Sequence, residues 1–516
     1  MPSKDIIKTF NILTKAATDS ENLQLFLESL ISLFPETPIN LIIISSLFNK
    51  SGKARKQKTL DESYLSNTNF KIKIASRNEL KRILAQSDTS SLFINLTSMS
   101  LPFKKFRAHI LDFNIAIIGS PLRRFLSFMT AAAKVKAHLI NFVPEPHSET
   151  FDIQLSLSFK YHKISKLVAL NAPYLVFRAV NYQKDKAFAV EPTTKKIDNH
   201  NLFTVIGVGA IRLIQPIKRR LFTRHFSIAY VTDQINSMFS AHKFHLKTIR
   251  TNKCQFLADP FIYRSTKPTV LFTEYIENPN KKGKIISLNI DDCGIITQNK
   301  ILLESSYHMS YPFIYERDTQ IFLIPESSEA RATTIFEIKQ NPADASLLTL
   351  TKTEMLLAGQ AIIDPTIIRF GTFYWLFCGA VDKLNDVNTK LFLYYSEDGL
   401  HNWKAHPKNP VVIDASRARP AGTPFFYQGR LYRPSQDCLK AYGKRLVINE
   451  VLSLTPSSYL EHPIAVIEPD HFLRIKQVHH IAHKDSLLVF DYVISHIKFF
   501  KCNANKSITL KIKHVS

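Results

Sequence analysis

The sequence predicts a multi-domain protein, with an α/β domain over residues 1–200 followed by an all-β, five-bladed β-propeller over residues 201–516. Three observations predict this arrangement. Short apolar runs alternate with helical segments in the first 200 residues, and one pattern recurs about every 50 residues after residue 255. A hydrophobic share of 45% with 21% charged residues is a globular composition, which excludes a largely disordered chain.

The first domain is predicted from strands and helices that alternate along the chain. Three short runs rich in Ile, Leu and Phe are predicted to be buried strands: residues 38–46, 91–97 and 114–118. Three segments are predicted to be helices: Ser20–Phe34, Asn78–Gln86 and Pro121–His138. Alternation of this kind is typical of a parallel sheet covered by helices, so we expect an α/β layer here.

The second domain is predicted from a repeat built around a proline. LADPFIY, MSYPFIY, IIDPTII and GTPFFY share one pattern, and their prolines are spaced by 52, 53 and 59 residues: Pro260, Pro312, Pro365 and Pro424. His479-His480-Ile481-Ala482 lies a further ~56 residues on and gives a fifth member without the proline. Repeats of this length are typical of propeller blades.

Further strand-like runs follow each repeated proline, separated by turn residues. Those in the first unit are Thr269–Tyr275 and Lys284–Ile290. Three or four antiparallel strands in about 50 residues make a blade, whereas a Greek-key sandwich would not repeat its proline start at a nearly fixed interval. An upstream strand, Phe226–Thr232, is expected to close the ring so that no sheet edge stays open.

Charge and composition limit the classes of partner that we expect for this protein. The 67 Lys and Arg against 43 Asp and Glu give a net charge of +24, spread over the chain without a nucleic-acid-binding motif. We therefore expect no specific nucleic acid partner and, at most, peripheral contact with anionic surfaces. No apolar run approaches the ~20 residues of a membrane span. The five cysteines are widely spaced and form no CxxC pair, so we expect neither a disulfide framework nor a bound metal. This cysteine pattern favours a cytoplasmic location. The sequence contains no cofactor-binding motif, so we expect no cofactor.

Acidic residues recur where the blades should face the propeller axis. Asp259, Tyr311, Asp364 and Thr423 precede the four prolines, and Glu274 and Glu326 follow the first two prolines by 14 residues. Gln436 and Asp437 take nearly the same place in the fourth unit, and three more residues flank the ring: His308, Arg419 and Arg433. Converging carboxylates are costly unless they are paired or used. They are therefore either a functional ring or structural partners of the arginines.

These motifs resemble a known family. LADPFIY, LFTEY, YHMSYPFIY, FLIPES and LYRPSQD are similar to the N-terminal propeller domain of glucosamine inositolphosphorylceramide transferases, over roughly residues 220–515. That domain is similar in fold to the five-bladed family-43 glycoside hydrolases. The resemblance implies a glycan or glycolipid ligand and a role in surface-polysaccharide or glycoconjugate metabolism.

The resemblance also implies roles for the ring residues. Asp259 would be the base, Glu326 the acid with Asp437 as a substitute, and Asp364 the residue that orients them, as in inverting glycoside hydrolysis. His308 and Tyr311 would bind sugar hydroxyls, with Glu274 beside them. Arg419, Arg433 and Gln436 would suit a carboxylate, phosphate or acetamido group.

Two departures limit what the resemblance implies. The transferases carry their transfer chemistry in a separate C-terminal domain, and this sequence ends at Ser516, so transfer activity is not implied. Bacterial relatives bear a formyltransferase-like domain in front, and residues 1–200 resemble a degenerate version of it. His109 and Asp112 lack the HxSxLP context of a formyl-transfer site, so we expect this domain to be non-catalytic.

Three hypotheses of function stay open on the sequence. The propeller binds a glycan or serves as a scaffold in glycoconjugate metabolism, or it hydrolyses a glycoside at the acidic ring, or it is an interaction protein whose basic surface meets anionic membranes. The first two share one site and differ in turnover.

Overall fold

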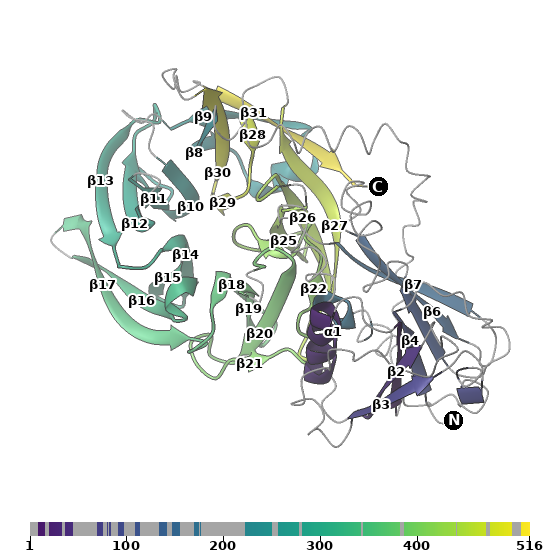
Figure 1. Cartoon of the computed structure of the whole chain (residues 1–516). Coiled ribbons are helices and arrows are strands. Elements are labelled where there is room, and N and C mark those ends of the chain that lie inside the picture. The colour runs from purple at the N-terminus through teal and green to yellow at the C-terminus, as the bar shows by residue number, and fades with distance from the viewer. Residues whose placement is uncertain are drawn as a thin grey trace. The chain divides into compact units, whose positions relative to one another are not determined.

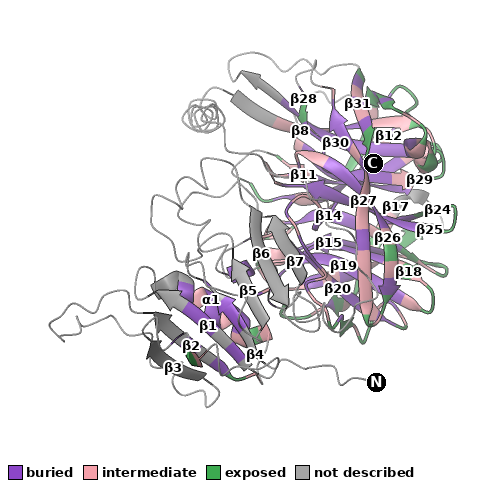
Figure 2. Cartoon of the chain, turned by 90° about the vertical axis from the view of Figure 1, so that its right-hand side faces the viewer, coloured by how far each residue is buried: buried purple, intermediate pink, exposed green. Residues whose placement is uncertain are grey.

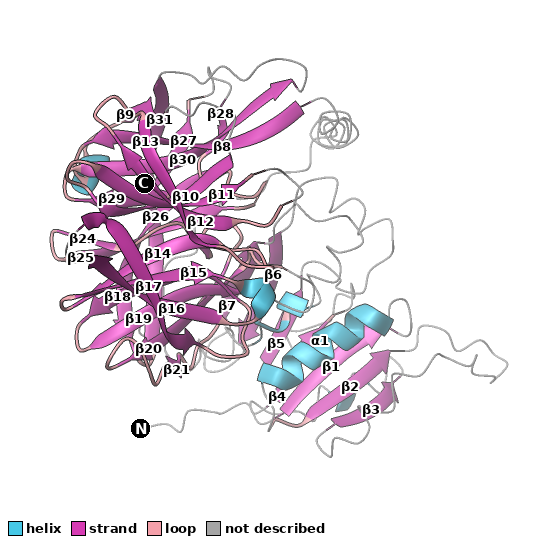
Figure 3. Cartoon of the chain, turned by 90° about the vertical axis from the view of Figure 1, so that its left-hand side faces the viewer, coloured by secondary structure: helices cyan, strands magenta, loops and turns pink. Residues whose placement is uncertain are grey.

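The computed structural model divides the chain into two compact units, Met1–Leu213 and Ile214–Ser516. In the first unit it describes residues 9–15, 20–33, 37–44, 70–75, 80, 82–83, 91–96, 109–113, 134–141, 147–154, 170–174 and 176. In the second it describes residues 222–249, 256–277, 281–341, 344–381, 386–439, 441–470, 475–497 and 507–515. Strands dominate both units (Figure 3). Among the described residues, no helix is long and apolar enough to cross a membrane.

The first unit contains a seven-stranded sheet in the order β3-β2-β1-β4-β5-β6-β7. The strands β3, β2, β1, β4 and β5 pair in parallel, and β6 and β7 add antiparallel pairs. Their bounds are β1 Thr9–Lys15, β2 Ile39–Ile44, β3 Phe70–Ala75, β4 Ser91–Asn95, β5 His109–Phe113, β6 Lys134–Asn141 and β7 His147–Gln154. Helix α1 spans Ser20–Leu33.

Helix α1 follows from its apolar spacing. Leu23, Phe26, Leu27 and Leu30 recur at the interval of helical turns, and all four are buried. The helix begins at Ser20, a residue favoured at helix starts. The predicted helix Ser20–Phe34 is therefore confirmed.

The other expectations for the first unit have mixed outcomes. The strands expected over residues 38–46 and 91–97 are present as β2 and β4. The helix expected over Pro121–His138 is wrong at its C-terminal end, because Lys134–Asn141 is strand β6; the β-branched Val135 and Ile140 favour a strand there. The strand expected at residues 114–118 lies outside the described residues, and the assignment of this unit to the α/β class stays a prediction.

The second unit begins its regular sheets at residue 256. Two four-stranded sheets run in sequence order, β10-β11-β12-β13 and β14-β15-β16-β17, and a five-stranded sheet holds β18 to β22. All their neighbouring strands pair antiparallel. Their bounds are β10 Phe256–Arg264, β11 Thr269–Ile276, β12 Lys284–Ile290, β13 Ile296–Leu303, β14 Ser310–Arg317, β15 Gln320–Glu326, β16 Thr333–Asn341, β17 Asp344–Leu356, β18 Ile362–Phe370, β19 Phe373–Ala380, β20 Lys390–Ser396, β21 Lys404–Ala405 and β22 Val412–Ile413.

The fourth sheet has eleven strands and joins both ends of the unit. Its order is β23-β25-β26-β27-β31-β9-β8-β30-β28, with β24 on β25 and β29 on β30. Its strands are β23 Arg419–Pro420, β24 Phe425–Tyr427, β25 Arg430–Asp437, β26 Arg445–Thr455, β27 Ser458–Pro469, β28 Ile475–Gln477, β29 Ile481–Lys484, β30 Leu487–Ile497, β31 Ser507–His514, β8 Phe222–Thr232 and β9 Lys243–Thr248. Strand β8 pairs with β30 along its whole length, so the expected upstream closing strand is confirmed.

The four sheets surround a common centre, with β10, β14 and β18 nearest to it (Figure 1). The second unit is therefore an all-β propeller. The number of blades stays a prediction, because the eleven-stranded sheet joins strands of more than one sequence repeat. Burial follows the strands of the sheets (Figure 2), and apolar clusters fill the space between neighbouring sheets.

The innermost strands carry a bulge before each of the first three repeated prolines. Asp259, Tyr311 and Asp364 have φ of 49°, 45° and 47°, and the pairing register shifts at each of them. Residues other than glycine rarely adopt such positive φ values. Because a bulge redirects a side chain out of the regular alternation, the same backbone device recurs where the acidic residues were predicted.

Candidate functional site

The acidic residues meet near the centre through contacts between neighbouring sheets. Asp259, Glu326 and Asp364 are 4%, 6% and 2% exposed. The backbone N–H of Asp364 donates to Oε2 of Glu326 at 3.2 Å, and that of Asp259 donates to Oδ2 of Asp491 at 3.0 Å. A carboxylate of the adjacent sheet therefore anchors the bulges at Asp259 and Asp364. We call Asp259, Glu326, Asp364 and Asp491 the hub acids.

Arg419 is the main counter-ion of two hub acids. Its Nε and Nη2 donate to the two oxygens of Asp364 at 2.7 and 3.4 Å, and its Nη2 lies 4.0 Å from Oε2 of Glu326. The Gln436 amide also donates to Asp364, at 3.4 Å. The guanidinium carbon lies 4.9 Å from the ring centre of Tyr442. This fork geometry fixes the Asp364 carboxylate firmly.

Glu326 is suited to hold a proton. Burial is the main cause that raises its pKa to about 8, and the nearby Asp364 raises it further while Arg419 lowers it. Its Oε1 accepts a hydrogen bond from the Ser328 hydroxyl at 3.0 Å. At neutral pH Glu326 is therefore mostly protonated, as a proton donor must be.

Asp259 faces a pair of histidines from the segment before β29. Nδ1 of His479 donates to Asp491 at 2.7 Å, and its Nε2 lies 3.7 Å from Oδ1 of Asp259. The pKa of His479 is raised to about 9, because the two carboxylates outweigh its burial. Burial raises the pKa of Asp259 well above its ordinary value, although His479 opposes this. Burial lowers the pKa of His480 to about 4, so this ring is neutral.

The same residues could hold a cation. One ligand atom from each of Asp259, His479 and Asp491 lies within 4.8 Å of the other two, and all three residues are buried. At neutral pH the imidazolium of His479 already supplies a positive charge between the two carboxylates. Metal binding would require this proton to leave.

Tyr311 closes the centre of the hub. Its oxygen accepts from the Gly422 N–H at 3.0 Å, and its hydroxyl lies 2.8 Å from Oγ1 of Thr366, which itself donates to the Asp364 carbonyl. The side chain is fully buried. Its hydrogen-bonding capacity is therefore committed within the protein, which is not what the predicted sugar contact requires.

His308 and Glu274 form a more open edge beside the hub acids. Nε2 of His308 lies 3.3 Å from Glu274, and its Nδ1 accepts from the Gly283 N–H at 3.0 Å. The His308 side chain is 34% exposed. A Cβ on Gly283 would lie 2.7 Å from Cε1 of His308, so the glycine permits this close approach.

Two predicted residues are held elsewhere. Arg433 forms a bidentate pair with Glu461 at 2.8 and 2.7 Å and also donates to the Arg417 carbonyl. Asp437 accepts from Nε of Arg445 at 2.6 Å. The first pair links β25 to β27 across β26, and the second links β25 to its neighbour β26, so both residues are paired within the eleven-stranded sheet rather than with the hub acids.

Sequence reasoning missed Asp491, and it gave His479 no role in the site. Asp491 accepts hydrogen bonds from the backbones of Asp259, His479 and His480. The missed signal is an aspartate inside the apolar run LLVFDYVI. A buried charge within such a run costs free energy of folding unless it is paired, so it indicates that the aspartate contacts a polar partner in the folded protein.

These sheets and this acidic hub define an all-β protein of the propeller class. The chain belongs to the family described as Glucosamine inositolphosphorylceramide transferase 1, N-terminal, which matches residues 215–475. The family name supports a carbohydrate-related function.

Curated relatives share this part of the chain. Glucosamine inositolphosphorylceramide transferase 1 of Arabidopsis thaliana is 29% identical over 252 residues, 48% of this chain and 32% of that protein. The protein of the same name from Oryza sativa subsp. japonica is 29% identical over 213 residues, 40% of this chain and 28% of that protein. The chain thus spans about a third or less of the length of these relatives.

Solved structures give a weaker likeness. A GH43_1 enzyme from Xanthomonas citri is 10% identical with a TM-score of 0.32, over 53% of this chain and 95% of its own. An exo-beta-1,3-galactanase from Clostridium thermocellum is 12% identical with a TM-score of 0.31, over 42% and 50%. TM-scores this low carry no argument, so the strand pairing defines the fold.

Proposed function

We propose that the second unit is a five-bladed propeller that binds a sugar residue of a glycan or glycolipid at the hub acids. The eleven-stranded sheet would then count as two blades, one of β23 to β27 and one of β28 to β31 with β8 and β9. One observation carries the proposal: Glu326, Asp364 and Arg419, from three different sheets, form a connected polar cluster in an apolar surrounding.

Sugar recognition fits the chemistry of this cluster. Carboxylates accept hydrogen bonds from sugar hydroxyls, and a protonated Glu326 donates one. His308 and Glu274 provide a partly exposed edge beside the cluster, where a ligand can approach. A bound sugar would replace hydrogen bonds that the hub acids now make with one another.

Inverting glycoside hydrolysis is the second candidate, and the raised pKa of Glu326 favours it. Glu326 would protonate the leaving oxygen, and Asp259 would take a proton from the attacking water. Asp259 must first lose its own proton. The His479 imidazolium at 3.7 Å favours that ionised state. Asp364, held by Arg419, would orient the reacting groups.

Three amide variants test both candidates: Asp259→Asn, Glu326→Gln and Asp364→Asn. The full-length protein and each variant are assayed for binding on a glycan array and for turnover of a panel of aryl glycosides. Glu329→Gln is the matched control, because Glu329 is a half-exposed partner of Lys282 three residues from Glu326. The glutamine oxygen can still accept the hydrogen bond that Glu329 now accepts from the His308 backbone N–H.

The outcomes separate the candidates. Binding that the three hub variants weaken and the control keeps, without turnover, supports recognition alone. Turnover that falls at least a hundredfold in Glu326→Gln supports hydrolysis. A wild-type protein that neither binds nor turns over any glycan, or hub variants that behave like Glu329→Gln, overturns the proposal.

A further inference from the structure

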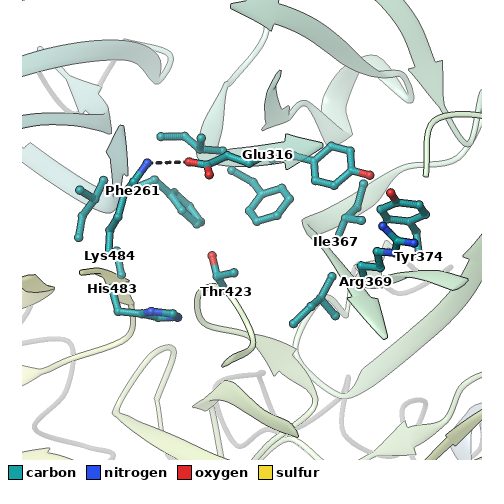
Figure 4. Close-up of a pocket in the computed structure, with 14 residues that line it drawn as sticks. Phe261, Glu316, Ile367, Arg369, Tyr374, Thr423, His483 and Lys484 are labelled. Carbon is teal, nitrogen blue, oxygen red and sulfur yellow. Dashed lines mark hydrogen bonds and ion pairs between the residues drawn. The ribbon is translucent and has the colours of Figure 1, made fainter. Parts of the chain in front are cut away.

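A cavity opens on the other side of the bulges. It has a volume of about 370 Å³ and is lined mainly by residues that follow the repeated prolines, among them Phe261, Phe313 and Ile367. Of the hub acids, Asp259 and Asp364 precede two of those prolines on the inner strands β10 and β18, while Glu326 in β15 and Asp491 in β30 accept hydrogen bonds from the backbones of these two residues. The cavity therefore lies farther along β10 and β18 than Asp259 and Asp364 do. Figure 4 shows the residues that line it.

An aromatic cluster separates this cavity from the hub acids. The ring centres of Phe261, Tyr311 and His480 lie 5.0, 5.3 and 4.6 Å apart in edge-to-face contacts. Tyr311 and His480 are fully buried. A ligand in the cavity therefore does not touch the hub acids, and the two sites can be tested independently.

The rim of the cavity carries one positive charge without an acidic partner. Lys484 pairs with Glu316 at 2.6 Å, which cancels both charges. The Arg369 guanidinium lies 5.5 Å from the ring centre of Tyr374, and among the described residues no carboxylate pairs with it. An exposed guanidinium beside an apolar cavity is suited to a carboxylate.

The wall of the cavity offers polar groups opposite this charge. The Thr423 side chain points into the cavity (Figure 4). Nε2 of His483 is buried without a hydrogen-bond partner, while the ring bonds to the Thr423 backbone. Burial lowers the pKa of His483 to about 4, so the ring is neutral and adds no positive charge to the cavity wall.

We propose that this cavity binds a small ring-shaped carboxylate that carries a hydroxyl group. Phe261, Phe313 and Ile367 contact the ring face, Arg369 binds the carboxylate, and the Thr423 hydroxyl, which points into the cavity, forms a hydrogen bond with the ligand hydroxyl. The volume lies near the lower end of the ~300–1,000 Å³ of ligand sites, which fits a single ring. The inference goes beyond the proposed function and does not depend on it.

Isothermal titration of the full-length protein tests the proposal with two acids that share this chemistry, 4-hydroxybenzoate and galacturonate. Their neutral counterparts, 4-hydroxybenzamide and galactose, are the ligand controls. We expect saturable binding of at least one acid and at least tenfold weaker binding of its neutral counterpart. The acid that binds more tightly identifies an aromatic or a sugar source.

Variants locate the binding. Arg369→Gln should weaken acid binding at least tenfold, whereas Arg331→Gln, at an exposed arginine in a turn away from the cavity lining, should leave it unchanged. Asp364→Asn should also leave it unchanged, because the aromatic cluster lies between the sites. Binding of neither acid, equal binding of the neutral counterparts, or an unchanged Arg369→Gln overturns the proposal. Loss in Asp364→Asn with Arg369→Gln unchanged would assign the acid to the hub instead.

Discussion

Replacing Glu326 by Gln should stabilise the folded protein, and the gain should grow with pH. A folded-state pKa of about 8 against an ordinary value of 4.5 means that the folded state keeps a proton that the unfolded state releases. Wild-type stability therefore falls as pH rises from 4.5 to 8. At about 1.4 kcal/mol for each pH unit, this cost is about 3 kcal/mol at pH 7 and about 5 kcal/mol above pH 8.

The glutamine removes this cost because it has the shape of the protonated acid. It can still accept the hydrogen bond from the Asp364 backbone, and its amide can donate to the Ser328 hydroxyl. At pH 4.5 the folded state keeps the proton and half of the unfolded molecules keep it too, so we expect a gain of only about 0.4 kcal/mol there.

Denaturant unfolding of the full-length protein at pH 4.5, 7 and 8.5 measures the effect. The control Glu329→Gln removes an exposed ion pair with Lys282 and should change stability by less than about 1 kcal/mol at every pH. A difference between Glu326→Gln and wild type that stays constant with pH, or a loss of stability at pH 8.5, would refute the reasoning.

Three further predictions use the same unfolding measurement. His479→Asn should cost about 3–5 kcal/mol at pH 6, because it leaves the buried Asp491 carboxylate without its counter-ion. The cost should shrink as pH rises from 6.5 through about 9, where wild-type His479 itself loses its proton. Arg433→Met should cost about 3–5 kcal/mol, and a second change, Glu461→Leu, should recover most of it without affecting glycan binding. Gly422→Ala should cost about 3 kcal/mol or more, since the φ of Gly422 is 127° and the new Cβ would lie 1.9 Å from a backbone oxygen. The control Gly429→Ala, which has open space around the new Cβ, should cost about 1–2 kcal/mol.

The sequence repeat could be predicted because the same backbone conformation recurs in the inner strands. Each inner strand needs a bulge at the same place, and a residue followed by proline recurs there in the first three units. The fourth unit breaks the pattern: its inner strand is split into β23 and β24 around Gly422. The end of the predicted helix Pro121–His138 failed because local composition did not reveal that Lys134–Asn141 pairs with two other strands.

The hub acids were predictable in part. Asp259 and Asp364 share the bulge position, so the repeat itself pointed to them. Arg433 and Gln436 were both predicted to contact the ligand, because both are polar and they lie close together in the sequence. They lie three positions apart in β25, so they point to opposite faces of the strand. Gln436 consequently reaches Asp364, while Arg433 reaches Glu461.

The partners of Asp259 depend on distant pairing. Asp491 follows it by 232 positions, and the two meet where β30, paired with β8, packs against β10. Short-range patterns hold no information about such a contact. The available signal was an acidic residue in an apolar strand, and this signal does not identify the residue that the acid contacts.

The pairing of β8 with β30 and of β9 with β31 has a consequence for biogenesis. Residues 222–248 leave the ribosome long before their partners at residues 487–514 are synthesised. Until then the early strands have exposed edges, which attract other chains and favour aggregation. Contacts of such sequence separation also form slowly. Growth temperature and chaperone supply should therefore govern the soluble yield of this protein.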